Sequence, residues 1–355
     1  MQWCCNRYFI PMTTPHAHGL SRRQWLQSAL AASGALALPS LSSTAFAVRP
    51  LPSDFLTTGK TVTLVVGGPA GGATDGVARA VAQQLSLSLG HEIIVENKAG
   101  AAGTIGSKFV SQAKNDGHTL LLGQIAPNVL APLMQQPHPY DPVQGFTPIG
   151  QIGNTASVLV VAEAGPKTLQ EAFAQWKQAG SVSYASTGMG SGAHLLGHLM
   201  AQELGAQGLH VPYRGSPFAL QDLVGGRVDC MMVTAGAIGA YIDAKKLRPL
   251  AVASHHRSRF YPALPTLREV GLDSVVNEGW FGLFSSANTP TDIAQAWHAH
   301  LNHALLQPAL IQQLENLVVD VAASKSQEEY AQFIRKETEH WSQVVGKLGQ
   351  ALKTT

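Results

Sequence analysis

The chain has 355 residues, 45% of them hydrophobic and 13% charged, which is enough apolar material for two packed domains and excludes a disordered chain. Its formal net charge of +2 comes without a basic cluster, so the sequence gives no reason to expect a nucleic acid partner. The histidines lack the spacing of a metal site, and residues 48–355 hold one cysteine, Cys230, which we expect to be a buried thiol. We therefore expect no metal ion, no cofactor and no disulfide in this part of the chain.

Residues 1–47 are typical of an export signal that is later removed. Residues 21–26 read Ser-Arg-Arg-Gln-Trp-Leu, which resembles the twin-arginine motif S-R-R-x-F-L. The apolar stretch at 26–38 is too short for a permanent transmembrane helix, and Ala45-Phe46-Ala47 offers a cleavage site. We therefore expect a twin-arginine signal peptide, cleavage after Ala47 and a mature protein in the periplasm.

Strands and helices alternate through the first part of the mature sequence. Apolar, β-branched runs predict strands at 61–66, 92–96 and 119–122. The spacing of apolar residues predicts helices at 75–89 and 105–113. This βαβαβ order is typical of a doubly wound α/β lobe.

A second α/β series follows a strand expected at 157–162, which would cross from one lobe to the other. Further strands are expected at 182–186, 208–211, 227–233 and 250–254, and helices at 168–178, 193–204 and 216–224. A strand at 280–284 is expected to cross back, and the last helices are expected at 290–305, 308–317 and 327–348. These elements predict two doubly wound α/β lobes with a ligand cleft between them. We expect lobe 1 at residues 48–160 plus 286–355, and lobe 2 at residues 161–285.

Two glycine-rich turns occupy corresponding places in the two predicted lobes. The first spans 67–75 and the second spans 186–194, and each follows a strand and precedes a helix. Such a corner exposes backbone N–H groups at the start of a helix, where they can bind an anion. Open α/β sheets bind ligands at the carboxyl edge of their strands. The two turns therefore predict the capture of a small anion between the lobes.

The predicted site combines these turns with polar side chains at the same sheet edges. The predicted ligand-binding residues are Pro69, Ala70, Gly71, Gly72, Asp75, Gln124, Asn128, Ser186, Thr187, Gly190, Ser191, His194, Arg214 and Thr234. Structural roles stay open for several of them: Asp75 also suits the first turn of a helix, His194 also suits a cap, and Arg214 also suits an exposed rim. Ser191→Ala plus His194→Ala is expected to abolish a ligand-induced rise in melting temperature and to leave the free protein nearly unchanged.

Several short motifs occur in a fixed order along the mature chain. They include Gly71-Gly72-Ala73-Thr74-Asp75, Val95-Glu96-Asn97-Lys98, Asp116-Gly117-His118-Thr119, Pro139-Tyr140-Asp141-Pro142, His210-Val211-Pro212-Tyr213-Arg214-Gly215 and Trp280-Phe281-Gly282-Leu283. This series resembles the Bug-type periplasmic solute-binding proteins, the receptor family of tripartite tricarboxylate transporters. The family's first turn usually begins Pro-Phe, and Gly67-Gly68 stand there instead.

The resemblance implies a fold of the type II periplasmic-binding-protein, or Venus-flytrap, kind. It implies a small carboxylate ligand, membrane transporter subunits or a sensor as partners and no catalytic role, and we expect a monomer. The identity of the ligand stays open among dicarboxylates, amino acids and aromatic acids, and Gly67-Gly68 remove an aromatic group that the family usually places beside the ligand.

Enzymatic and scaffold functions are the alternatives. Gly188, Gly190 and Ala193 satisfy the pattern G-x-G-x-x-A between a strand and a helix, which would suit an exported NADP-dependent oxidoreductase. A serine hydrolase is less well supported, because the sequence around Ser191 is not G-x-S-x-G. A scaffold protein would not need a glycine-rich corner in both lobes.

Overall fold

The computed structural model describes residues 55–56, 59–135 and 137–348. The predicted signal peptide and its cleavage site lie outside these residues. None of the described helices combines the length and the apolar character that a membrane span requires.

The first part of the chain forms a parallel arrangement around a central strand. β1 (Val62–Val66) pairs in parallel with β2 (Ile93–Asn97) on one side and with β3 (Thr119–Gln124) on the other. The connecting helices are α2 (Ala73–Leu89) and α3 (Thr104–Ser111), with a short turn η1 (Ala101–Gly103) before α3. α2 buries apolar side chains at helical spacing and ends at Gly90, whose left-handed backbone caps it as predicted.

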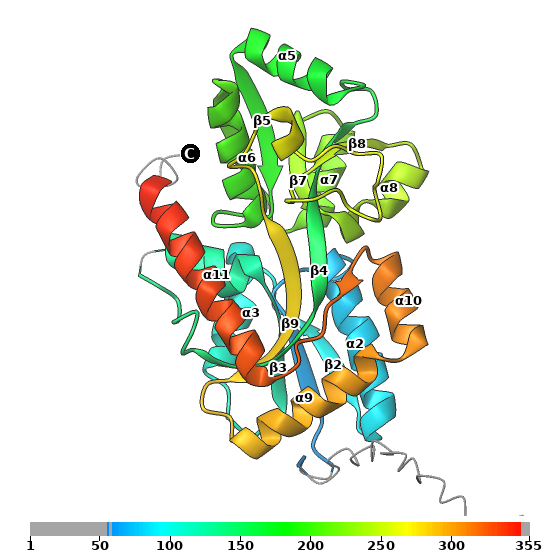
Figure 1. Ribbon diagram of the computed structural model, residues 1–355, viewed down its shortest axis with the longest axis vertical. Coiled ribbons are helices and arrows are strands. Elements are labelled where there is room, and N and C mark those ends of the chain that lie inside the picture. The colour runs from blue at the N-terminus through cyan, green and yellow to red at the C-terminus, as the bar shows by residue number, and fades with distance from the viewer. Residues whose placement is uncertain (1–54, 57–58, 136, 349–355) are drawn as a thin grey trace, which may run out of the picture. The chain divides into compact units, whose positions relative to one another are not determined.

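Two long strands link the two lobes (Figure 1). β4 (Phe146–Ala162) pairs antiparallel with β9 (Glu278–Ser286), and β9 also pairs antiparallel with β3. Beyond residue 156, β4 leaves β9 and pairs with β7 (Cys230–Thr234) and β8 (Leu247–Val252). The expected crossing strand at 157–162 is therefore the last part of a longer strand. Residues 146–156 were not predicted to be a strand, because two register shifts break the alternation of their side chains.

The second lobe repeats the alternation of strands and helices. β5 (Ser181–Ser186) lies between β6 (Gln207–Pro212) and β7, and both pairs are parallel. Its helices are α5 (Leu169–Ala179), α6 (Gly192–Leu204) and α7 (Ser216–Val224), with short turns η3 (Ala235–Ala237), α8 (Gly239–Asp243) and η4 (Arg268–Val270). β7 begins later than expected because residues 225–227 form a turn after α7. The short turns η3 and α8 were not predicted.

The last helices return to the first lobe, as predicted. α9 (Thr291–Leu305) packs on β4 and α2, and α10 (Pro308–Asn316) packs on α2. β10 (Asp320–Val321) adds to β4, and α11 (Gln327–Leu348) packs against β4 and the turns η2 (Ala126–Leu130) and α4 (Ala131–Met134). The result is a mixed α/β fold with two lobes and a curled sheet in the order β2-β1-β3-β9-β4-β7-β5-β6, so the predicted fold class is confirmed. The boundaries of the lobes stay a prediction.

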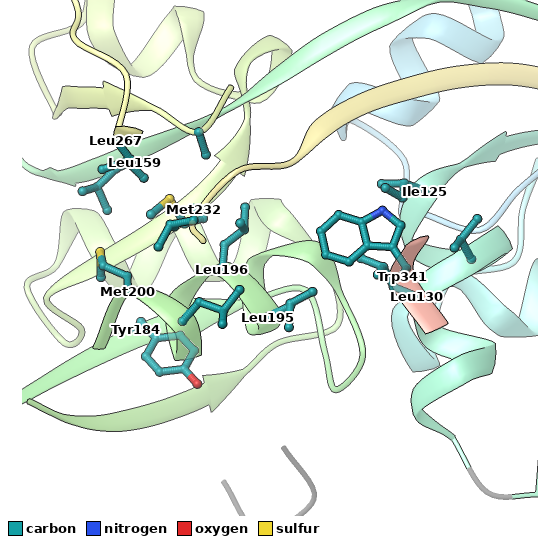
Figure 2. Close-up of a cluster of buried hydrophobic side chains, with 14 of the residues drawn as sticks. Ile125, Leu130, Leu159, Tyr184, Leu195, Leu196, Met200, Met232, Leu267 and Trp341 are labelled. Carbon is teal, nitrogen blue, oxygen red and sulfur yellow. The ribbon is translucent and has the colours of Figure 1, made fainter. Parts of the chain in front are cut away.

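Each lobe has its own apolar core, and a third cluster connects them. That third cluster includes Leu195 and Leu196 of α6 together with Leu130 and Trp341 from the other lobe (Figure 2). Cys230 belongs to it, so the prediction of a buried thiol is confirmed, and burial raises the pKa of this thiol. The apolar packing is therefore continuous from one lobe to the other beside the linking strands.

Candidate ligand-binding site

The first glycine-rich turn joins β1 to the start of α2. Gly72 is the N-cap of α2, so the amide groups of Ala73 and Thr74 have no acceptor within the helix. The tip of the turn, Ala70 and Gly71, is exposed. The turn therefore presents the start of α2, rather than its own tip, to the interior of the protein.

Asp75 organises this turn from within. Its carboxylate accepts hydrogen bonds from the Gly71 amide, from Asn97 Nδ2 and from Arg79 Nε, each at 3.0 Å. Burial by itself raises the pKa of Asp75, but the hydrogen bonds from Arg79, Gly71 and Asn97 outweigh it, so the pKa is lowered. A structural role for Asp75 therefore explains all of these contacts. Arg79 also forms an ion pair with the Asp75 carboxylate, so the negative charge is already balanced.

We expect Asp75→Ala to destabilise the free protein by about 2 kcal/mol, because it removes the buried acceptor of three hydrogen bonds and the ion-pair partner of Arg79. Urea unfolding of the purified protein measures this difference. Asp75→Asn keeps one acceptor oxygen and should lose less. Equal stability of the alanine variant and the wild type would contradict this role.

The second glycine-rich turn is held by buried side chains beneath it. Ser191 is the N-cap of α6 and accepts a hydrogen bond from the His194 amide at 3.2 Å. The Gly188 amide donates to Ser186 Oγ at 3.1 Å, and the Gly190 amide donates to His194 Nδ1 at 3.3 Å. Since both side chains cap or brace the turn, we now expect Ser191→Ala plus His194→Ala to destabilise the free protein as well, in contrast to the expectation from sequence.

His194 and His210 stack under this turn. Their ring centroids lie 4.1 Å apart, and His210 Nε2 lies 2.6 Å from Ser186 Oγ. Because His194 Nδ1 accepts the Gly190 amide, the proton of the neutral ring belongs on Nε2. Burial, together with the neighbouring histidines His210 and His198, lowers the pKa of His194 to about 3. The neutral ring is thus part of the folded turn.

Stability should fall in mild acid because of His194. An unfolded histidine takes up its proton near pH 6.5, whereas the folded His194 stays neutral down to about 3, so acid favours unfolding across that interval. His194→Asn keeps an acceptor near Gly190 but cannot titrate. We expect it to remove up to about 1.4 kcal/mol per pH unit from the slope of unfolding free energy between pH 6 and pH 4. Urea unfolding at several pH values tests this, and an unchanged slope would contradict it.

A pocket of about 110 Å³ lies where the two turns, the linking strands and β7 meet. Three helices begin at its wall: α2 through Ala73 and Thr74, α6 through Gly192 and Ala193, and α7 through Ser216. No His, Cys, Lys, Asp or Glu of the described residues lines it. The wall is therefore made of amide groups, hydroxyls, apolar side chains and a single charge.

The structure brings six of the predicted residues to this pocket. They are Pro69, Gly72, Gln124, Thr187, Arg214 and Thr234. The other eight do not line it: Ala70, Gly71, Asp75, Asn128, Ser186, Gly190, Ser191 and His194. Their places follow from the contacts above, and buried Asn128 accepts the Gln124 amide in the same way. Seven of these eight residues belong to the two turns, and Asn128 lies in η2; a contact between any of them and a ligand stays a prediction.

Arg214 supplies the charge of the pocket. Its side chain is exposed at the start of α7. Every other arginine among the described residues forms an ion pair, whereas Arg214 has neither an ion pair nor a hydrogen bond there. A guanidinium without a protein partner is available to an anionic ligand.

Five wall residues on or beside the linking strands are absent from the predicted site. They are Thr155, Ser157, Asn277, Gly279 and Trp280. The predicted crossing strands contain Ser157 and Trp280, but the sequence does not reveal which of their faces meets the cleft. A rule that treats the polar residues of a crossing strand as wall residues would have found Ser157.

The two glycines of the unusual Gly67-Gly68 pair have different structural roles. A Cβ at residue 67 would lie 2.6 Å from the Gly103 carbonyl oxygen, so close packing requires glycine there. A Cβ at residue 68 would meet nothing nearer than Thr74 Cβ at 3.8 Å, and Gly68 lines the pocket. Glycine at 68 therefore leaves open the space that a larger side chain would occupy.

Comparison with known proteins identifies the family. The model of the tripartite tricarboxylate transporter family receptor matches residues 77–350. The chain belongs to this family. The Bug-type resemblance is thereby confirmed, and this receptor family is one of solute-binding proteins with carboxylate-binding members.

Solved structures of related receptors have the same fold. The periplasmic binding protein BugD is 29% identical with a TM-score of 0.78, over 82% of this receptor and 99% of that chain. MatC from Rhodopseudomonas palustris with bound malate is 30% identical with a TM-score of 0.76, over 81% and 99%. Rpa4515 from R. palustris with adipate is 27% identical with a TM-score of 0.78, over 82% and 98%.

Proposed function

We propose that this protein captures a small carboxylate between its two lobes, as a monomer, and delivers it to a transporter of the tripartite tricarboxylate type. The observation that carries the proposal is the charge of the pocket: Arg214, which has no partner in the described part of the chain, stands beside the starts of α2, α6 and α7. Helix starts carry partial positive charge and free amide groups, so they favour an anion. Malate and adipate, bound by two related receptors, are both carboxylates, which supports the same ligand chemistry here.

Contacts between the lobes support capture by closure. A Cβ at Gly215 of the second lobe would lie 2.4 Å from Pro69 Cγ of the first, and one at Gly188 would lie 3.3 Å from the Ala102 amide nitrogen. Since both lobes contribute to the pocket wall, a ligand that contacts both favours this arrangement over a separated one. The arrangement with ligand enclosed would be the form that a transporter recognises.

A binding role fits the wall better than catalysis does. The described wall holds no histidine, cysteine, lysine or carboxylate that could act as a base or nucleophile. The oxidoreductase alternative would need free amides in the turn at 188–193 to hold a pyrophosphate. In that turn, the Gly188 and Gly190 amides already donate to Ser186 and His194.

Thermal unfolding of the mature protein with a panel of ligands tests the proposal. The panel holds malate, adipate and citrate, the neutral diamide of succinate as a matched control, and NADP. A carboxylate that binds should raise the melting temperature in proportion to the logarithm of its concentration, and the diamide should not. Stoichiometric binding of NADP with no response to any carboxylate would favour the oxidoreductase instead.

We also propose that residues 1–47 direct this protein to the periplasm through the twin-arginine route. Arg22→Lys plus Arg23→Lys should leave the full-length precursor in the cytoplasm, because that route reads the paired arginines. Cell fractionation and mass determination of the mature N-terminus measure this, with cleavage after Ala47 as the expected result. Export of the variant at the wild-type level would contradict the twin-arginine route.

A further inference from the structure

A short segment of the first lobe, residues 315–320, contacts the second lobe outside the pocket wall. It runs from the end of α10 into β10, and none of its residues lines the pocket. The Val318 side chain packs against the apolar cluster that β7, β8 and α7 share in the second lobe. A Cβ at Gly236 of η3 would lie 2.2 Å from the Leu317 carbonyl oxygen, so the backbones of the two lobes touch there. We call residues 315–320 the docking segment.

Arg259 adds a charged contact between the second lobe and the docking segment. It lies in the loop after β8, and its Nη2 lies 2.9 Å from Glu315 Oε1 and 2.9 Å from Asp320 Oδ1. The guanidinium carbon lies 4.3 Å from the centre of the Phe260 ring, a cation–π contact that restricts the side chain. One arginine thus joins the carboxylates at both ends of the docking segment. Such a network of charges contributes more than an isolated exposed ion pair does.

The backbone of the docking segment is strained in the conformation that brings its two carboxylates together. Val318 has a φ angle of 58°, which is an outlier for a β-branched residue. Strain of this kind persists only where surrounding contacts hold it. Here Thr155 Oγ1 of β4 donates to the Val318 carbonyl at 3.1 Å, and the Val318 amide donates to the Glu315 carbonyl at 2.9 Å. The turn therefore presents Glu315 and Asp320 together to Arg259.

From these contacts we propose that Arg259 is a positioning residue for ligand capture. By binding the docking segment, it holds the second lobe in the arrangement that encloses the ligand, although it does not line the pocket itself. This inference rests on the proposed function and adds a residue that acts from outside the site. A ligand that needs one arrangement of the lobes binds more weakly when less of the free protein has it. Loss of the Arg259 contacts lowers that fraction and leaves the pocket wall intact.

Calorimetric titration of the mature protein with malate, adipate and citrate tests this inference. Arg259→Ala should lower the affinity for whichever acid binds by about two- to fivefold, the range of an exposed ion pair. Arg257→Ala is the matched control. Arg257 lies in the same loop and is equally exposed, at 51%, but it pairs with Glu269 within the second lobe, so its variant should keep the wild-type affinity.

A double-mutant cycle connects the loss to the docking segment. Glu315→Ala plus Asp320→Ala removes both partners of Arg259, so this variant should lose about as much affinity as Arg259→Ala does. When Arg259→Ala is added to it, the affinity should change little further, because the contacts are already gone.

A distance measurement on the free protein tests the same inference without a ligand. Gln83→Cys on α2 and Gln178→Cys on α5 place one exposed labelling site on each lobe, whereas Cys230 is buried. Pulsed electron paramagnetic resonance between spin labels at the two sites measures the separation of the lobes. Arg259→Ala should increase the share of long distances, and Arg257→Ala should leave the wild-type distribution.

The outcomes separate this inference from the proposed function. Wild-type affinity or wild-type label distances in Arg259→Ala would overturn the role of Arg259, as would an equal loss in Arg257→Ala. Fully additive losses in the cycle would also overturn it, because the ion pairs would then not explain the effect. A wild-type protein that binds none of the three acids would end the proposed function, while the label distances would still test whether Arg259 holds the lobes together.

Discussion

Arg214→Ala should lower the affinity for a carboxylate ligand by about 10- to 100-fold, the loss expected when a charge-assisted hydrogen bond is removed. The described part of the chain gives this guanidinium neither an ion pair nor a hydrogen bond. The melting temperature of the free variant should therefore stay close to that of the wild type. Calorimetric titration and unfolding of the same preparation separate the two effects.

Arg214→Lys and the salt dependence sharpen this result. Lysine keeps the positive charge but cannot form a bidentate pair of hydrogen bonds with a carboxylate. The affinity of Arg214→Lys should therefore fall between those of the wild type and the alanine variant. Added salt should weaken binding to the wild type more than binding to Arg214→Ala, because the exposed charge is screened. Arg335→Ala, an exposed arginine of α11 paired with Glu328, is the matched control and should bind normally. An Arg214→Ala protein with wild-type affinity would remove this residue from the site.

Local sequence patterns predicted the framework of the fold well. β1, the turn after it and α2 were each predicted from residues that are close together in the sequence. Gly90 is an example, because a glycine at that place predicted the end of α2. The sheet edges that carry the two turns also follow from the order of strands alone. The family was identifiable for the same reason, since its motifs are short and fall on these corners.

Long-range pairing explains what the sequence did not reveal. Residues 146–156 of β4 form a strand because β9 pairs with them across more than 120 residues of sequence, despite register shifts near Gly150 and Gly153. Thr155 becomes a wall residue through that pairing, opposite Gly279. Whether Arg214 has an acidic partner depends on where all the acidic residues lie in the folded protein. A sequence motif could therefore point to this arginine, but it could not show that its guanidinium has no ion pair among the described residues.

The glycine-rich turns show the same limit at close range. From sequence, Asp75, Ser191 and His194 are polar groups beside an anion site, and a structural role was left open for Asp75 and His194 but was not considered for Ser191. The structure resolves the ambiguity by hydrogen bonding: Ser191 binds an amide of its own helix, and His194 and Asp75 bind amides of their own turns. A polar residue at the start of a helix is therefore weak evidence for ligand contact unless its hydrogen-bonding capacity is unused.

Gly215→Ala should weaken ligand binding on the order of tenfold to a hundredfold, because two costs coincide at this residue. Its φ angle of 137° is strained for any other amino acid, and an added Cβ would lie 2.4 Å from Pro69 Cγ and 2.7 Å from Pro69 Cδ. The backbone strain acts at the start of α7. The clash with Pro69 acts between the lobes and opposes the arrangement that encloses the ligand. Calorimetric titration measures the combined loss.

Two further variants separate these costs. Gly226→Ala, after the other end of α7, places a side chain at a φ of 68° with no atom within 4 Å, so it carries strain without an inter-lobe clash and should bind nearly normally. Pro69→Ala removes the two atoms that the new Cβ would meet. The double variant Gly215→Ala plus Pro69→Ala should therefore bind more tightly than Gly215→Ala alone, a coupling that a double-mutant cycle measures directly. Additive losses would mean that the clash does not limit closure, and that the strain at Gly215 accounts for the whole effect.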